Sequence, residues 1–220
     1  MNKPMVIWDD LECVLLDLDG TLLDKNFDNY FWMKAVPREY AAKNGLSLDE
    51  AKDHLFSLYK SQEKTLNWTD IDFWSRTLGL DIVELKNQLS HRVAVLPGVT
   101  EFLDYVLSRN KSLHLATNAH PKTIAIKMAR TGLDRYFHSM ISSSDIGYPK
   151  EDPRFWDGIK KEVGFSNNRT MFVDDDLEVL RTARTWGLDH VFHKARNNFD
   201  GPDEVTEEFP AVICFSQLMT

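Results

Sequence analysis

Short apolar blocks alternate with amphipathic helical patterns along most of this chain, and this alternation constrains the fold more than any other feature. The first block, 13–18, reads Cys-Val-Leu-Leu-Asp-Leu and ends at the turn Asp19-Gly20-Thr21. Later blocks of similar character cover 113–117, 139–142, 170–174, 190–193 and 211–215. Helical patterns between them cover 100–108, 121–130, 153–163 and 177–186. The alternation predicts βαβ units, and therefore an α/β fold with a parallel, Rossmann-like sheet that carries helices on both faces.

The segment 25–95 lacks this alternation and has helix signals only. Capping-box patterns begin at Ser47 and Asp81, and Gly45 and Gly79 stand where helices typically end. These signals predict an inserted unit of three or four helices. Leu96-Pro97-Gly98-Val99 then predicts the return to the sheet. We therefore expect a core domain formed by residues 1–24 and 96–220, and a helical domain formed by residues 25–95.

Composition excludes several classes of function. A net charge of −8 disfavours binding to nucleic acid, because such binding needs an excess of Lys and Arg. No basic segment followed by an apolar run opens the chain, and no apolar stretch approaches the length of a membrane span. Cys13 and Cys214 are the only cysteines and lack metal-type spacing. We therefore expect a cytoplasmic protein, a monomer or small homo-oligomer, that binds neither nucleic acid nor membrane.

Polar side chains follow the predicted strands where these end. They are Asp17 and Asp19, Thr117 and Asn118, Lys150, and the pair Asp174 and Asp175. Because the carboxyl ends of parallel strands meet at one edge of a sheet, we expect these groups to lie together. Carboxylates about 4 Å apart repel by about 4 kcal/mol per pair at an effective dielectric constant near 20, so the cluster predicts a bound cation. Oxygen ligands favour Mg²⁺, which also binds substrate phosphates.

Each of these residue types has a task in phosphoryl transfer. The Asp17 carboxylate can attack phosphorus and form an acyl phosphate. Asp19 can protonate the departing oxygen and later deprotonate the attacking water. Thr117, Asn118 and Lys150 can bind the phosphoryl oxygens and stabilise their charge. The sequence therefore predicts a hydrolase of phosphate monoesters, and the global negative charge makes Lys150 and the metal the local source of positive charge.

Structural readings compete with these assignments one by one. Asp-x-Asp-Gly alone is explained by a turn, and Lys150 alone by a surface lysine. Asp176 is explained by a helix N-cap, and His120 by an exposed turn. His190 and His193, three apart on a strand, face opposite sides and cannot chelate one ion. The order of the four groups along the chain, each at a strand end, favours catalysis over this set of coincidences.

The four groups resemble the motifs of the haloacid dehalogenase superfamily. Asp17-Leu18-Asp19-Gly20-Thr21 resembles its first motif, Thr117-Asn118 its second, Lys150 its third and Asp174-Asp175 its fourth. The resemblance implies a superfamily core with an inserted C1-type helical cap. It also implies that Asp17 is the nucleophile and Asp19 the acid and base. The implied Mg²⁺ ligands are Asp17, the Asp19 backbone carbonyl and Asp175, with Asp174 binding directly or through water.

Four further segments are similar to bacterial nucleotidases that act on GMP and IMP. They begin at Phe27, Thr65, Thr117 and Gly147. This similarity implies hydrolysis of purine nucleoside 5′-monophosphates. Three alternatives stay open: a phosphatase of sugar phosphates or phosphoglycolate, a signalling domain that accepts a phosphoryl group, and a non-catalytic binding domain. Asp19 disfavours a dehalogenase, because a departing halide needs no proton donor.

Overall fold

The computed structural model describes residues 6–219. Residues 1–5 and 220 lie outside this description, and with them the ends of the predicted core domain and the first part of the segment considered as an export signal. Six parallel strands form one sheet in the order β3-β2-β1-β4-β5-β6. Their bounds are β1 Cys13–Leu16, β2 Ser112–Thr117, β3 Ser139–Ser142, β4 Thr170–Asp174, β5 His190–Lys194 and β6 Ala211–Val212. The predicted α/β class and parallel sheet are confirmed.

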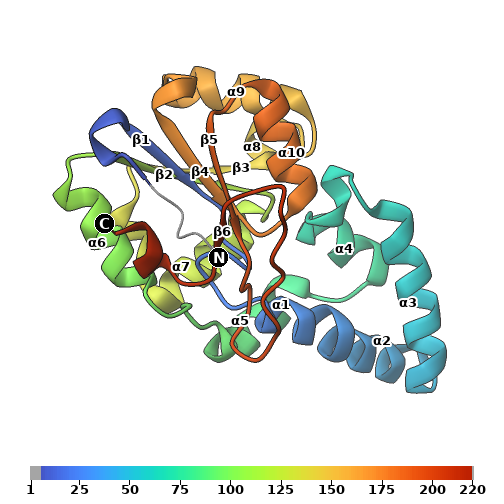
Figure 1. The fold of residues 1–220 in the computed structure, drawn as a ribbon. Helices are drawn as coiled ribbons and strands as arrows, with labels where there is room; N and C mark the ends of the chain where they lie inside the picture. The colour runs from blue at the N-terminus through green and yellow to red at the C-terminus, as the bar shows by residue number, and fades with distance from the viewer. Residues whose placement is uncertain (1–5, 220) are drawn as a thin grey trace.

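Helices cover both faces of the sheet, as Figure 1 shows. They are α6 Val99–Ser108, α7 Pro121–Thr131, α8 Ser143–Ile146, α9 Pro153–Val163 and α10 Leu177–Trp186. Side chains alternate along β1, so that Val14 packs with residues of α6 and α7, whereas Leu15 packs with residues of α9 and α10. The central strands β1 and β4 are buried on both faces, which explains their continuous apolar character.

The last strand is shorter than the predicted block 211–215. Strand β6 ends at Val212, and a 3₁₀ turn begins at Phe215. The side-chain oxygen of Gln217 accepts hydrogen bonds from the backbone N–H groups of Ile213 (2.7 Å) and Cys214 (3.1 Å). The Gln217 side chain thus occupies two backbone N–H groups that a longer strand would use for pairing. The strand therefore ends at Val212, although the apolar residues after it favour a strand.

Five α-helices lie in the segment 25–95, more than the three or four predicted, because the segment is divided into shorter helices than the sequence signals suggested. They are α1 Asn26–Tyr30, α2 Val36–Asn44, α3 Leu48–Gln62, α4 Ile71–Leu78 and α5 Ile82–Leu89. A π-helical turn joins α1 to α2 just before Pro37, which cannot donate a backbone hydrogen bond. The helices share a hydrophobic cluster of their own, in which Phe31, Tyr59 and Trp74 are buried. Within residues 6–219, no helix has both the length and the apolar character needed to cross a lipid bilayer.

The two connections to this helical segment run side by side. The N–H of Asp24 donates to Ala94 (2.9 Å), and the N–H of Leu96 donates to Leu22 (2.9 Å). An antiparallel bridge pairs Leu23 with Val95 between them. The chain therefore leaves the sheet region and returns to it at one place, near the carboxyl end of β1.

Candidate functional site

The central strands bring Asp17 and Asp174 side by side. Asp17 follows the last residue of β1, and its N–H donates to Val173 of β4 (3.0 Å). Asp174 is the last residue of β4, which neighbours β1 in the sheet. Both carboxylates are buried. Their placement follows from the parallel pairing, because neighbouring strands in register end at the same edge.

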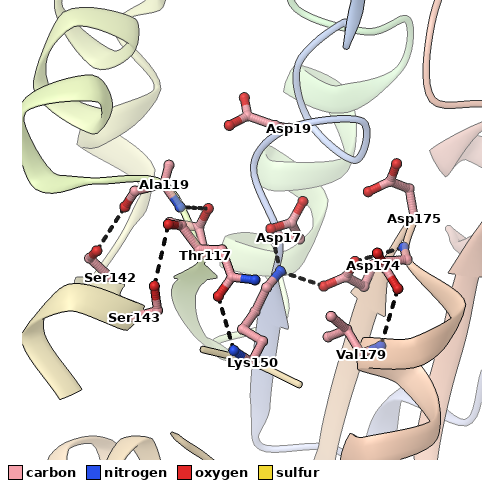
Figure 2. A network of polar contacts seen from close by, with 12 residues as sticks. Asp17, Asp19, Thr117, Ala119, Ser142, Ser143, Lys150, Asp174, Asp175 and Val179 are labelled. Carbon is pink, nitrogen blue, oxygen red and sulfur yellow. Dashed lines mark hydrogen bonds and ion pairs between the residues drawn. The ribbon is translucent and has the colours of Figure 1, made fainter. Parts of the chain in front are cut away.

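Lys150 bridges these two carboxylates (Figure 2). Its Nζ lies 2.5 Å from Asp17 Oδ1 and 2.6 Å from Asp174 Oδ2. Burial favours the neutral amine, but the two carboxylates raise the pKa of Lys150 above its ordinary value, so the side chain is an ammonium. Burial raises the pKa of Asp174 well above its ordinary value, and the Lys150 charge opposes this rise. The predicted lysine is thus buried in the acid cluster.

Asp175 is the third carboxylate of the acid cluster. Its carboxylate lies against the backbone of Gly20, where an added Cβ would be only 2.4 Å from Asp175 Oδ2. Gly20 also has a φ of +89°, which favours glycine. Lys25 Nζ lies 2.6 Å from Asp175 Oδ2. Burial raises the pKa of Asp175, and Lys25 opposes the rise.

Thr117 and Asn118 border the same site at the end of β2. The Thr117 hydroxyl is buried and accepts the N–H of Ala119 (3.1 Å), which leaves its proton available to a ligand. The Asn118 side chain accepts the backbone N–H of Lys150 (2.9 Å) and donates to Glu151 (2.9 Å). Asn118 therefore fixes the segment that carries Lys150.

Asp19 lies in the turn after β1, and its carboxylate is apart from Lys150 and Asp174 in Figure 2. Its Oδ1 accepts a hydrogen bond from Lys127 on α7 (2.6 Å). Burial raises the pKa of Asp19 to about 6, although the Lys127 charge opposes the rise. Asp19 therefore differs from Asp17 in both position and partner.

A cavity of about 280 Å³ joins these groups. One wall comes from the strand ends, with Asp17, Thr117, Lys150 and Asp175. Other lining residues come from the helical segment, and four of them are aromatic: Trp32, Tyr59, Trp68 and Trp74. A ligand with one anionic end and one aromatic end fits such a cavity.

The donor set of the site suits a hard divalent cation. Oxygen atoms of Asp17, Asp174 and Asp175 lie within 4.8 Å of one another. Three carboxylates face the two ammonium groups of Lys25 and Lys150, so one negative charge remains in excess. Oxygen ligands, burial and excess negative charge fit Mg²⁺. The Asp19 side chain is not in this group of oxygens.

Two charged contacts of the site were not predicted from the sequence. Lys25 was expected only as the first residue of the insert, and no pattern around it signals an ion pair with Asp175. Lys127 shows one signal in retrospect, because it lies on the buried face of α7 with Ile124 and Met128. A lysine in an apolar stripe at helical spacing indicates a buried partner.

The remaining alternatives have structural explanations. Asp176 caps α10 by accepting the N–H groups of Glu178 and Val179. His120 caps α7, and its Nε2 lies 3.8 Å from Asp70 of the helical segment. His190 and His193 both lie on β5.

Comparison with known proteins places the chain in a family. Residues 11–187 match the model of the haloacid dehalogenase-like hydrolases. The GMP/IMP nucleotidase YrfG of Escherichia coli (strain K12) is 40% identical over 183 residues, which cover 83% of this chain and 82% of the relative. A phosphoglycolate phosphatase of Pseudomonas syringae pv. tomato is 23% identical over 206 residues, which cover 91% and 75%. Both relatives are named as phosphate hydrolases.

A solved structure shows the same fold. The HAD phosphatase of Thermococcus onnurineus superposes with a TM-score of 0.80 at 23% identity, over 94% of this chain and 95% of that chain. The predicted superfamily core is therefore confirmed, and so is the prediction of an enzyme that hydrolyses phosphoric monoesters. Sheet order, strand-end residues and sequence match agree: the chain belongs to the haloacid dehalogenase-like hydrolase family.

Proposed function

We propose that this protein is a Mg²⁺-dependent phosphatase that forms an aspartyl phosphate on Asp17 and acts on purine nucleoside 5′-monophosphates such as GMP and IMP. The observation that carries the proposal is the buried Asp17 carboxylate at the strand edge, which is paired with Lys150 and lies within 4.8 Å of the oxygens of Asp174 and Asp175. The E. coli relative, named a GMP/IMP nucleotidase, supports the substrate class.

In the proposed first step, a carboxylate oxygen of Asp17 attacks phosphorus while the ester P–O bond breaks. Asp19 gives its proton to the departing alkoxide, which leaves as the nucleoside. In the second step, Asp19 takes a proton from water as the water attacks phosphorus, the acyl phosphate opens, and Asp17 and inorganic phosphate are released. Lys150 and Thr117 hold the phosphoryl oxygens throughout.

Asp17, Asp174 and Asp175 are the side chains proposed to hold Mg²⁺, together with the backbone carbonyl of Asp19. The bound ion supplies positive charge that offsets the phosphoryl oxygens and the carboxylates. Lys150 and Lys25 supply the remainder of the positive charge. In the proposed site, the positive charge thus comes from two lysine side chains of the protein and one bound Mg²⁺ ion.

The helical segment is proposed to act as the cap domain over residues 25–95, closing against the core of residues 1–24 and 96–220. Its aromatic wall supplies a surface for the base. Trp68 keeps 39% of its surface exposed although it lines the cavity, and the buried Tyr59 hydroxyl has no hydrogen-bond partner within residues 6–219. Stacking on Trp68 and a hydrogen bond from Tyr59 suit a purine ring better than a small acid.

A substrate panel tests the proposal. We expect GMP and IMP to have kcat/KM values at least about tenfold above those of sugar phosphates and phosphoglycolate in the presence of Mg²⁺, since pocket contacts of this kind contribute 10–200-fold. W68A should raise KM for GMP and leave kcat/KM for phosphoglycolate nearly unchanged. Preference for phosphoglycolate or a sugar phosphate would refute the substrate assignment.

Acid quenching separates the enzyme from a phosphoryl-accepting signalling domain. With GMP in excess, we expect mass spectrometry to find phosphate on the peptide that contains Asp17, and this label to disappear within seconds of substrate exhaustion. A label that persists for minutes, or turnover without any label, would refute the proposed cycle.

Both cysteines are free thiols, which is in keeping with the cytoplasm as the proposed location.

A further inference from the structure

A second group of buried charges lies beside the proposed catalytic residues. Lys127 Nζ is 2.6 Å from Asp19 Oδ1 and 2.5 Å from Asp28 Oδ2. Lys86 Nζ is 3.1 Å from the other oxygen of Asp28. Three ion pairs connect the four side chains in the order Asp19, Lys127, Asp28 and Lys86. We call them the Lys127 relay.

The relay joins three parts of the chain. Asp19 follows β1, Lys127 lies on α7, and Asp28 and Lys86 come from α1 and α5 of the helical segment. The Lys127 and Lys86 side chains are only 1% and 2% exposed. Lys86 is also held by aromatic faces, since its Nζ lies 4.3 Å from the centre of the Phe31 ring. These constraints give the relay a fixed geometry.

Lys127 has no other carboxylate partner within residues 6–219. Its ammonium therefore restrains the Asp19 carboxylate, while Asp28 restrains the ammonium from the other side. The Asp19 side chain keeps 24% of its surface exposed and borders the cavity. One oxygen is thus bound by Lys127, and the side chain still borders the cavity in which the substrate is proposed to bind.

We propose that Lys127 is a positioning residue for Asp19, and that Asp28 and Lys86 anchor Lys127 in the place from which it does so. The proposal rests on the proposed function, in which Asp19 protonates the departing oxygen as the ester P–O bond breaks. Misplacing Asp19 harms that proton transfer. It does not harm the attack of Asp17 on a substrate whose leaving group departs as a stable anion.

This difference between leaving groups gives a readout that a purely structural role would not move. A nucleoside alkoxide needs the proton, whereas p-nitrophenolate leaves without it. The ratio of kcat/KM for GMP to kcat/KM for p-nitrophenyl phosphate reports the proton transfer when KM for GMP keeps its wild-type value, because kcat/KM covers binding and all steps up to departure of the leaving group. Misfolding lowers both values by the same factor and leaves the ratio unchanged.

The experiment compares the full-length wild type with K127M and K122M in the presence of Mg²⁺. We expect K127M to lose about 100-fold in kcat/KM for GMP, within the range for a general acid, and less than about fivefold for p-nitrophenyl phosphate. Lys122 is the matched control, since it also lies on α7 and pairs with Asp72 of the helical segment at 2.7 Å, but it does not touch Asp19. K122M should keep the wild-type ratio within about twofold, as expected for an exposed pair.

A charge-balanced variant covers the case in which K127M does not fold. D28N/K86M removes one charge of each sign and leaves the contact between Lys127 and Asp19. We expect the ratio to fall about tenfold, because Lys127 loses its anchor. An unchanged ratio in the folded variants would overturn the inference. A wild type that hydrolyses neither substrate would instead overturn the proposed function.

Discussion

The two groups of mostly buried charges differ in their balance. The site cluster, Asp17, Asp174, Asp175, Lys25 and Lys150, has three acids and two lysines. The Lys127 relay has two acids and two lysines. One cluster therefore keeps capacity for a further cation, and the other neutralises itself. The difference teaches that buried charge alone does not identify a binding site, whereas an unbalanced set of convergent carboxylates does.

The largest expected effect is on activity and comes from the unbalanced cluster. D17N should lower kcat for GMP by at least about 10⁴-fold, as loss of a catalytic nucleophile does. The melting temperature should stay constant or rise, because Lys150 keeps Asp174 and one repulsive charge is gone. Steady-state kinetics and thermal melts measure the two effects.

The matched control is D176N, which removes a neighbouring charge and keeps the helix cap, since Asn caps as well as Asp. It should retain activity within several-fold. Turnover by D17N at the wild-type rate would show that the unbalanced cluster does not carry the reaction.

The balanced relay should affect stability in addition to the proton transfer. D28N leaves Lys86 buried without a carboxylate and should cost about 3–5 kcal/mol of unfolding free energy. At about 2–4 °C per kcal/mol, the melting temperature should fall by about 6–20 °C. K64M is the control, because it breaks an exposed pair with Glu178 and should cost less than about 1 kcal/mol. A D28N melt like that of wild type would remove the contrast between the clusters.

Mg²⁺ should distinguish the clusters directly. At 100 times its dissociation constant, the ion should stabilise the wild type by about 2.7 kcal/mol. This corresponds to a rise of about 5–11 °C in melting temperature. D175N should lose most of the rise, and D28N should keep it. Equal shifts in both variants would mean that the ion does not bind at the unbalanced cluster.

The smallest expected effect concerns a buried ionisable group outside both clusters. Burial, with a smaller contribution from the neighbouring His138, lowers the pKa of His114 from 6.5 to about 4. The unfolded chain therefore takes up a proton that the folded chain excludes, so this stability is complete above pH 6.5 and is lost as the pH falls toward 4. The loss at pH 5 should be about 2 kcal/mol.

Urea unfolding at pH 7 and pH 5 measures this effect. H114Q should flatten the pH slope, whereas H91Q, at an exposed position, should leave it as in wild type. A slope that survives in H114Q would assign the acid sensitivity to the two clusters instead.

The strand-end residues could be predicted because each one ends an apolar block. Asp17, Thr117 and Asp174 stand at the carboxyl ends of strands whose parallel direction the alternating pattern already implies, so their convergence follows from the topology. The role of Lys150 is less evident from the sequence, because a lone lysine before a helix is usually exposed. Only its place in the order of the motifs favours a buried role. The structure leaves it 3% exposed.

The lysines that neutralise the clusters could not be predicted in the same way. Lys25, Lys86 and Lys127 find their partners across distances of 58 to 150 residues along the chain. Such pairs depend on how elements distant in the sequence pack against one another, and local patterns do not encode that packing. Helix propensity treats lysine as an ordinary surface residue, so only its position in a buried stripe reveals it.

The side-by-side connections at Leu22–Asp24 and Ala94–Leu96 bear on how such an enzyme diversifies. Because the chain departs and returns through two segments paired by hydrogen bonds, a change in the length of the segment between them would leave the sheet and the proposed nucleophile in place. A recombination event could exchange the whole excursion for a shorter or longer one. Such an exchange would change the residues that contact the rest of the substrate, while the residues at the strand ends would stay the same.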